Sequence, residues 1–301
     1  MNAVGEWASS AGFMAGWRLI KTMPEGASYA AFDRIADSLW SRNKGGVVQL
    51  ERNLRRVHPD YSHEELRALS REGMRSYMRY WCEAFRLPTW SPQRITSTFH
   101  MERRHLMDEA LASGTGAVMV PGHMANWDHA GAWGCLRYGG LTTVAERLKP
   151  QKLYEQFLAY RQKMGFEVLG LGDPDVMRTL IRRLREGRLV ALLGDRDLSG
   201  SGVHVQLFGE TASLPAGPAL LSMTTGAPLH PVTMWFDGEL TRAYVHDRIE
   251  VPTGLDRDAA VVAMTQQIAD AHAEGIRKHS RDWHMLQKVW LADVSRTRVA
   301  A

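Results

Sequence analysis

The segment 121–128, with the sequence PGHMANWD, holds a histidine and an aspartate five residues apart. A neutral imidazole can act as a general base, and an ionised carboxylate can fix which ring nitrogen carries the proton. On one continuous helix this spacing would turn the two side chains about 140° apart. His123 and Asp128 can therefore meet only if His123 lies in a loop and Asp128 in the first turn of the next helix. The alternative is structural, with Asp128 as a helix cap beside a loop histidine.

The residues around this segment predict a strand, a tight turn and a helix. Residues 116–120 are apolar and β-prone, and Pro121-Gly122 follows them directly, which is typical of a buried strand ending in a turn. Asn126 is a good N-cap for a helix that runs to about Leu136. An aspartate in the first turn is stabilised by the helix dipole and by free backbone N–H groups, so we expect Asp128 to be ionised.

Strands and helices alternate from residue 116 onward, which predicts an α/β fold with a mostly parallel sheet flanked by helices. Ligands of such sheets bind beyond the carboxyl ends of the strands. Five charged or titratable residues come directly after predicted strands, and we expect them to share one site. They are His123, Glu146, Arg147, Asp195 and Arg196. The predicted strands are 116–120, 141–145, 166–171 and 188–193, and the helices between them begin at Asn126, at about Lys152 and at Asp173-Pro174.

The first 90 residues predict a helical region, and residues 116–290 an α/β core, within one domain spanning residues 1–301. Ser62 and Glu65 form a capping box at the start of a long helix that ends before Pro88. Residues 1–23 predict a helix carrying Trp7, Phe13, Trp17, Arg18 and Lys21, which suits either a membrane interface or ordinary packing on the domain. Later predicted elements are strands at about 203–209, 229–236 and 242–250, helices at 214–226 and 258–279, an aromatic segment at 282–290 that packs on the sheet, and a loose end at 295–301.

The composition is that of a globular protein, with 45% hydrophobic and 23% charged residues. The net charge of +4 suits an anionic membrane surface or an anionic co-substrate, and is too diffuse to indicate nucleic acid. Cys82 and Cys135 form no disulfide framework, so we expect reduced thiols in a cytosolic protein. With neither a signal peptide nor a run of eighteen apolar residues in this sequence, we expect any lipid to be handled from the membrane surface.

Several blocks in a fixed order resemble the bacterial lipid A-type acyltransferase family, and within it the actinobacterial phosphatidylinositol mannoside acyltransferases. The resemblance covers about residues 12–290. It rests on the His-x4-Asp motif of 122–128 and on further blocks whose shared order and spacing are distinctive. These blocks are TVAERLKP at 143–150, DRDL at 195–198, SGV at 201–203, FGE at 208–210, LPAGPA at 214–219 and DWHMLQ at 282–287.

The resemblance implies a helix-covered parallel sheet with a buried acyl groove, and an enzyme that acts peripherally at the cytoplasmic face of the cell membrane. It implies acyl-CoA or an acyl carrier protein as donor, palmitoyl-CoA by preference, and a mannose hydroxyl of the glycolipid as acceptor. No other cofactor and no metal is implied. On this basis His123, Asp128 and Asp195 are the expected catalytic residues, and Glu146, Arg147, Arg196 and Trp127 are expected to bind substrate.

The chemistry of the residues agrees with acyl transfer. An alcohol is a poor nucleophile at neutral pH, and a neutral imidazole can remove its proton during attack on a thioester. The sequence holds no Gly-x-Ser-x-Gly elbow, so we expect no covalent acyl-enzyme. Three alternatives stay open: transfer to another glycolipid or lysophospholipid, a non-catalytic lipid or acyl-CoA carrier, and a metal-dependent hydrolase. The last would draw its ligands from His123, Asp128, His129, Asp195 and Asp197.

Overall fold

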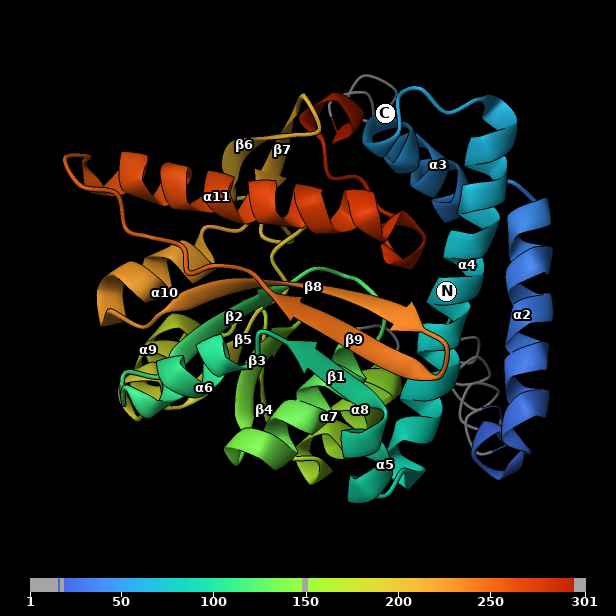
Figure 1. The fold of residues 1–301 in the computed structure, drawn as a ribbon, viewed down its shortest axis with the longest axis horizontal. Helices are drawn as coiled ribbons and strands as arrows, with labels where there is room; N and C mark the ends of the chain where they lie inside the picture. The colour runs from blue at the N-terminus through green and yellow to red at the C-terminus, as the bar shows by residue number, and fades with distance from the viewer. Residues whose placement is uncertain (1–15, 17–18, 148–150, 295–301) are drawn as a thin grey trace.

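The computed structural model describes Gly16, residues 19–147 and residues 151–294. In this part of the chain, seven strands form one sheet in the order β1-β9-β8-β2-β5-β3-β4, and β6 and β7 form a separate hairpin (Figure 1). The neighbours from β8 to β4 are parallel, and only the β8–β9 pair of this sheet is antiparallel. The predicted fold class is confirmed. The strands are β1 (Phe99–Glu102), β2 (Ala117–Pro121), β3 (Leu141–Ala145), β4 (Phe166–Gly170), β5 (Leu189–Ala191), β6 (Val203–Leu207), β7 (Glu210–Leu214), β8 (Leu229–Asp237) and β9 (Leu240–Val245).

The order of the strands places two distant loops side by side. The chain runs from β2 through β3 and β4 before β5 inserts between β2 and β3. β2 and β5 are parallel, and Val118 pairs with Val190 in their register. Their carboxyl ends therefore lie at the same edge of the sheet, and the segments that follow them, which contain His123 and Asp195, must be neighbours.

The core lies on both faces of the sheet, and β2 shows why. All five of its residues are buried, as expected for a central parallel strand. Ala117 and Met119 belong to one hydrophobic cluster, while Val118 and Val120 belong to another, because successive side chains of a strand point to opposite faces. Helices cover both faces, and α11 crosses one of them beside the β6–β7 hairpin (Figure 1). The covering helices are α6 (His105–Ala112), α7 (Trp127–Tyr138), α8 (Gln151–Lys163), α9 (Val176–Arg185), α10 (Gly217–Thr225) and α11 (Arg257–Lys278).

The N-terminal helices stand at the edge of the sheet where β8 ends (Figure 1). The longest of them, α4 (His63–Arg86), packs against α2 (Glu25–Ser41) and α3 (Gly46–Val57). Its predicted capping box is confirmed, since Ser62 accepts a hydrogen bond from the backbone of Glu65 while the Glu65 side chain accepts one from the backbone of Ser62. A short helix, α5 (Pro92–Ser97), follows it. None of the helices in the described part of the chain combines the length and apolar character needed to cross a membrane.

Three local predictions need correction or fall outside the description. The helix expected to start at Asp173-Pro174 begins at Val176, because the Asp173 carboxylate accepts the N–H of Gly170, three residues earlier, and so does not cap the helix. The short strands β1 and β7 were not predicted. Of the helix expected over residues 1–23, only Gly16 and the residues from 19 onward are described, and the expected loose end at 295–301 lies outside the described residues.

Candidate active site

Two glycines allow the segments after β2 and β5 to approach each other closely. Gly122 precedes His123, and Gly194 precedes Asp195. A Cβ atom on Gly122 would lie 3.3 Å from Oδ2 of Asp195, and one on Gly194 would lie only 2.2 Å from Cγ1 of Val120. Neither glycine has a positive φ, so these positions favour glycine for space and not for backbone conformation.

His123 and Asp195 form a hydrogen-bonded dyad. Nδ1 of His123 lies 2.6 Å from Oδ1 of Asp195, and the backbone N–H of His123 donates to Oδ2 at 2.8 Å. Burial opposes ionisation of the carboxyl group, which is 1% exposed, but His123 and its hydrogen bonds outweigh burial and hold the pKa of Asp195 below its usual value. An ionised carboxylate only accepts hydrogen bonds, so Nδ1 carries the proton and Nε2 keeps its lone pair. This arrangement leaves Nε2 available as a general base.

Trp283 completes the hydrogen bonding of Asp195. Its indole Nε1–H donates to Oδ2 at 2.9 Å, and the whole residue is buried. The sequence placed Trp283 in an aromatic segment that packs on the sheet and gave it no role at the site. A buried tryptophan needs an acceptor for its N–H group, which was the one available signal, but the sequence could not show which acceptor it meets.

Asp128 does not hold His123, which corrects the expected pairing. Its Oδ1 accepts Nε of Arg161 at 2.7 Å, and its Oδ2 accepts Nη2 of Arg161 at 3.0 Å and the hydroxyl of Tyr80 at 3.0 Å. Asp128 lies in the first turn of α7 as predicted, but there it faces α4 and α8. The aspartate of the His-x4-Asp motif therefore ties three helices together beside the dyad.

The contacts with Asp128 also keep Arg161 largely buried. The Arg161 side chain is 16% exposed. Burial works against its charge, but Asp128 raises the pKa of Arg161 well above its usual value. Burial and the nearby Asp128 charge likewise raise the pKa of the Tyr80 hydroxyl. Arg161 therefore stays charged and Tyr80 stays neutral, so the bidentate ion pair persists at physiological pH.

Trp127 lies beside the imidazole of the dyad. The two rings are 5.5 Å apart at an interplanar angle of 74°, and Trp127 stacks on Tyr80 with ring centroids 3.9 Å apart. Asn126 caps α7 as predicted, by accepting the N–H of His129, and its amide donates to Glu83 of α4 at 2.7 Å. The half-buried Trp127 is thus fixed against the His123 ring.

The charged residues after β3 and β5 are only partly brought together. Arg196 lies 3.4 Å from the carboxylate of Glu146, and its side chain is 17% exposed. Arg147 is 64% exposed and forms an ion pair with Asp173. Glu146 and Arg147, which are neighbours in the sequence, therefore pair with different partners. Glu146 after β3 thus pairs with Arg196, which directly follows Asp195, while Arg147 extends from the surface.

The remaining candidate metal ligands do not gather around the dyad. Asp197 accepts hydrogen bonds from the backbone of Ser199 and Gly202 and so shapes its own loop, and His129 contacts the backbone of Ile95. Within the described residues, no group of three or more His, Cys, Asp or Glu side chains is arranged to hold a metal ion.

A comparison with protein families places this site in a known context. The family model for bacterial lipid A biosynthesis acyltransferases matches residues 2–292. The chain belongs to this family. The protein is therefore an acyltransferase, and the sequence-based resemblance is confirmed.

Curated members of the family align along almost the whole chain. The phosphatidylinositol mannoside acyltransferase of Mycolicibacterium smegmatis (strain ATCC 700084 / mc(2)155) is 41% identical over 299 residues, which cover 99% of this chain and 96% of that protein. The phosphatidylinositol mannoside acyltransferase of Mycobacterium tuberculosis (strain ATCC 25618 / H37Rv) is 42% identical over 306 aligned positions, covering 99% of this chain and 94% of that protein. Similarity at this level includes both the helical N-terminal part and the sheet.

Proposed function

We propose that this acyltransferase moves a long acyl chain, preferentially palmitoyl, from acyl-CoA to a mannose hydroxyl of a phosphatidylinositol mannoside. The observation that carries the proposal is the His123–Asp195 dyad at the carboxyl edge of the sheet, in a chain that aligns end to end with mannoside acyltransferases. Transfer to another glycolipid or to a lysophospholipid is the second candidate, because the same dyad would activate any alcohol.

In the proposed reaction His123 moves one proton from the alcohol to the leaving thiolate. Nε2 accepts the proton of the mannose hydroxyl while its oxygen bonds to the thioester carbonyl carbon. The imidazolium is stabilised by Asp195, which stays ionised because of its lowered pKa. When the tetrahedral intermediate collapses, the C–S bond breaks and Nε2–H returns the proton to the CoA sulfur. The ester forms in one transfer, and no acyl-enzyme is needed.

The charged residues beyond β3 and β5 suit the anionic parts of the substrates. We assign the CoA phosphates or the acceptor head group to Arg147 and to the Glu146–Arg196 pair. The high exposure of Arg147 supports contact with a group that arrives from solvent. Arg196 directly follows Asp195, so a ligand held there would reach the dyad.

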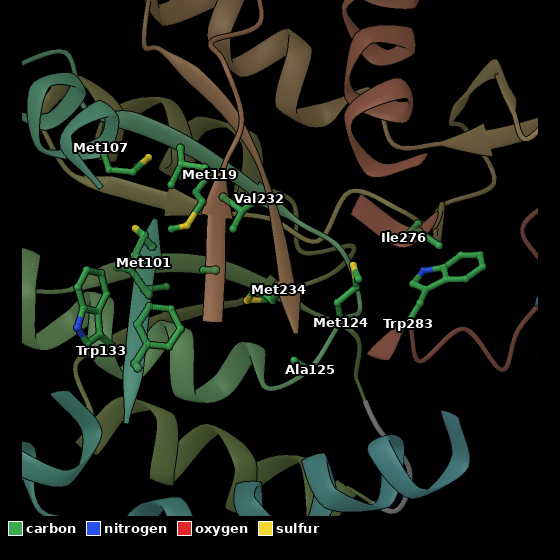
Figure 2. Close-up of a cluster of buried hydrophobic side chains, with 14 of the residues drawn as sticks. Met101, Met107, Met119, Met124, Ala125, Trp133, Val232, Met234, Ile276 and Trp283 are labelled. Atoms are coloured by element: carbon green, nitrogen blue, oxygen red, sulfur yellow. The ribbon is translucent and has the colours of Figure 1, made fainter. Parts of the chain in front are cut away.

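A methionine-rich cluster beside His123 supports a path for the acyl chain. It extends from Met124, the neighbour of His123, through Met234 to Met101 and Trp133 on α7 (Figure 2). Methionine side chains are flexible and can rearrange around an apolar chain, whose burial contributes about 0.8 kcal/mol per CH₂. The apolar side chains of α4 are divided between two other hydrophobic clusters. Met74 packs with α2 and α3, Trp81 and Phe85 pack with Phe157 and Tyr160 of α8, and Met78 contacts both groups.

We also propose peripheral association with the cytoplasmic face of the cell membrane. The absence of a spanning helix among the described residues and the lipid-biosynthesis family both agree with it. The helix expected to enter the interface lies almost entirely outside the described residues. Vesicle sedimentation of the full chain and of a chain lacking residues 1–23 tests this role, and equal binding by the two would exclude it.

The test of function is incubation of the purified protein with palmitoyl-CoA and a panel of mannosides, other glycolipids and lysophospholipids, with product masses measured. We expect a mass gain of one acyl group on a mannoside, and loss of product in His123→Ala at unchanged folding. Acylation of a different acceptor alone would replace the mannoside assignment. Binding of acyl-CoA that survives His123→Ala, with no product from either protein, would instead support a carrier. Activity abolished by chelators and restored by a divalent metal would support the hydrolase alternative.

A further inference from the structure

Three buried side chains form a hydrogen-bonded chain next to the dyad. The hydroxyl of Ser76 on α4 donates to Oδ1 of Asp282 at 2.6 Å, and Nε2 of His284 lies 2.8 Å from the same hydroxyl. Asp282 and His284 are 1% and 3% exposed. Because the single hydroxyl proton points to Asp282, Nε2–H of His284 must be the donor to Ser76. Burial agrees with this neutral form, since it lowers the pKa of His284 to about 3.

The residues that this hydrogen-bonded chain holds in place contact both His123 and Asp195. We call residues 282–284 the tail segment. Within it, Trp283 donates to Asp195, and the backbone N–H of His284 donates to the carbonyl of His123 at 2.8 Å. The carbonyl of Asp282 in turn accepts the N–H of Ala125 at 3.0 Å. The tail segment therefore pairs with the loop that carries His123 and also orients the carboxylate of Asp195.

The position of the tail segment depends on the Asp282 carboxylate. Oδ1 accepts from Ser76, and Oδ2 accepts the backbone N–H of Phe236 near the end of β8 at 3.2 Å. These two bonds join α4 and the sheet to the tail segment. Ser76 and Asp282 also line a cavity of about 940 Å³ between α2, α4 and the turn from β8 to β9, which neither His123 nor Asp195 lines.

We propose that Ser76 and Asp282 are positioning residues for acyl transfer, which act on the dyad through Trp283 and the backbone of His284. Neither contacts the dyad directly. Their contribution is to fix the angle of the Asp195 carboxylate against Nδ1 of His123, because a misplacement of about 1 Å in such a site can reduce turnover by about 100-fold. The inference rests on acyl transfer by this dyad, and does not depend on which alcohol is the acceptor.

The test compares two buried serines on the same helix. Ser76→Ala removes the link to the tail segment. Ser70→Ala is the matched control, since Ser70 is also buried on α4 but bonds Glu51 at 2.8 Å and Trp40 at 2.9 Å, away from the tail segment. Unfolding curves, kcat, KM for acyl-CoA and the proton NMR resonance of His123 Nδ1–H are measured for both variants and for Ser76→Thr, which keeps the hydroxyl.

We expect both alanine variants to lose similar stability, but only Ser76→Ala to lower kcat, by on the order of 10-fold at an unchanged KM, and to shift the Nδ1–H resonance. Ser76→Thr should restore part of kcat and return the Nδ1–H resonance part of the way to its original position. If Ser76→Ala does not fold, Trp283→Phe, which removes the final N–H donor together with part of the buried ring, must likewise lower kcat at an unchanged KM and shift the Nδ1–H resonance. An unaltered resonance and kcat in Ser76→Ala, or an equal kcat loss in Ser70→Ala, would overturn the proposal. Absence of mannoside transfer by the unmodified protein would refute the proposed acceptor but leave the resonance test intact.

Discussion

Asp195 and Asp128 are equally buried carboxylates, each about 1% exposed, yet they face opposite kinds of partner. Asp195 accepts hydrogen bonds from the imidazole of His123 and the indole of Trp283, while Asp128 accepts two from the permanently charged Arg161. A histidine can give up and regain a proton near neutral pH, and an arginine cannot. Burial therefore does not distinguish the two roles. The partner is what suits Asp195 to assist His123 in the proposed proton transfer, and Asp128 to support the site.

The largest expected effect separates the two carboxylates by kinetics. Asp195→Asn should lower kcat by on the order of 10²–10⁴, because an amide can present N–H to Nδ1 and so favour the wrong tautomer of His123. Its unfolding free energy should change much less than its rate. Steady-state assays with palmitoyl-CoA and circular dichroism of the same sample measure both. A variant with near-normal kcat would return Asp195 to a purely structural role.

Asp128→Asn should act mainly on stability. Removing one partner of a buried ion pair leaves the charge of Arg161 uncompensated, which costs about 3–5 kcal/mol of unfolding free energy. The double variant Asp128→Asn/Arg161→Met should recover much of that loss, as urea unfolding would show. The kcat of the folded fraction should fall less than in Asp195→Asn. If instead Asp128→Asn abolishes turnover without loss of stability, the division of roles between the two carboxylates is wrong.

The pH dependence of stability should report the buried imidazoles around the dyad. Burial lowers the pKa of His272 to about 4 and that of His284 to about 3, below the usual 6.5. Below about pH 6.5 the unfolded chain therefore binds more protons than the folded protein. Stability is highest above that pH, and each of the two histidines lowers the free energy of unfolding by about 1.4 kcal/mol per pH unit as the pH falls toward its folded pKa. Asp195, whose pKa is lowered, reduces the free energy of unfolding only when the pH falls below the usual carboxyl range. Urea midpoints at pH 7.5, 6 and 5 measure the slope, and His272→Asn should reduce it. A flat profile would contradict this assignment.

The smallest effect concerns the acyl chain. Ala132 lies on α7 in the same buried cluster as Met101 and Trp133. Ala132→Phe should shift the preferred donor from long to shorter acyl-CoA, while overpacking costs about 1–3 kcal/mol of stability. Activity with a panel of acyl-CoA lengths measures the shift. Equal loss at every length would mean that Ala132 belongs to the rigid core and that the chain binds elsewhere.

The sequence predicted the parallel sheet and the approach of His123 to Asp195 because both follow from local patterns. Apolar runs ending in glycine turns mark strand ends, and the ends of neighbouring parallel strands must meet. The partners of Asp128 were not predictable in the same way. They depend on the orientation of α7, because Arg161 from α8 and Tyr80 from α4 meet Asp128 only in the folded chain. Trp283 reaches Asp195 across 88 residues, a separation at which periodicity carries no information. β1, with four residues at the edge of the sheet, is too short to give a pattern.

The cavity between α2, α4 and the β8–β9 turn has a pharmacological consequence. Ser76 and Asp282 form part of its lining, whereas His123 and Asp195 are not part of its wall. A small molecule designed for this cavity would compete with neither the thioester nor the glycolipid. Its inhibition would be noncompetitive, lowering kcat at a constant KM, and accumulation of either substrate in a cell would not overcome it.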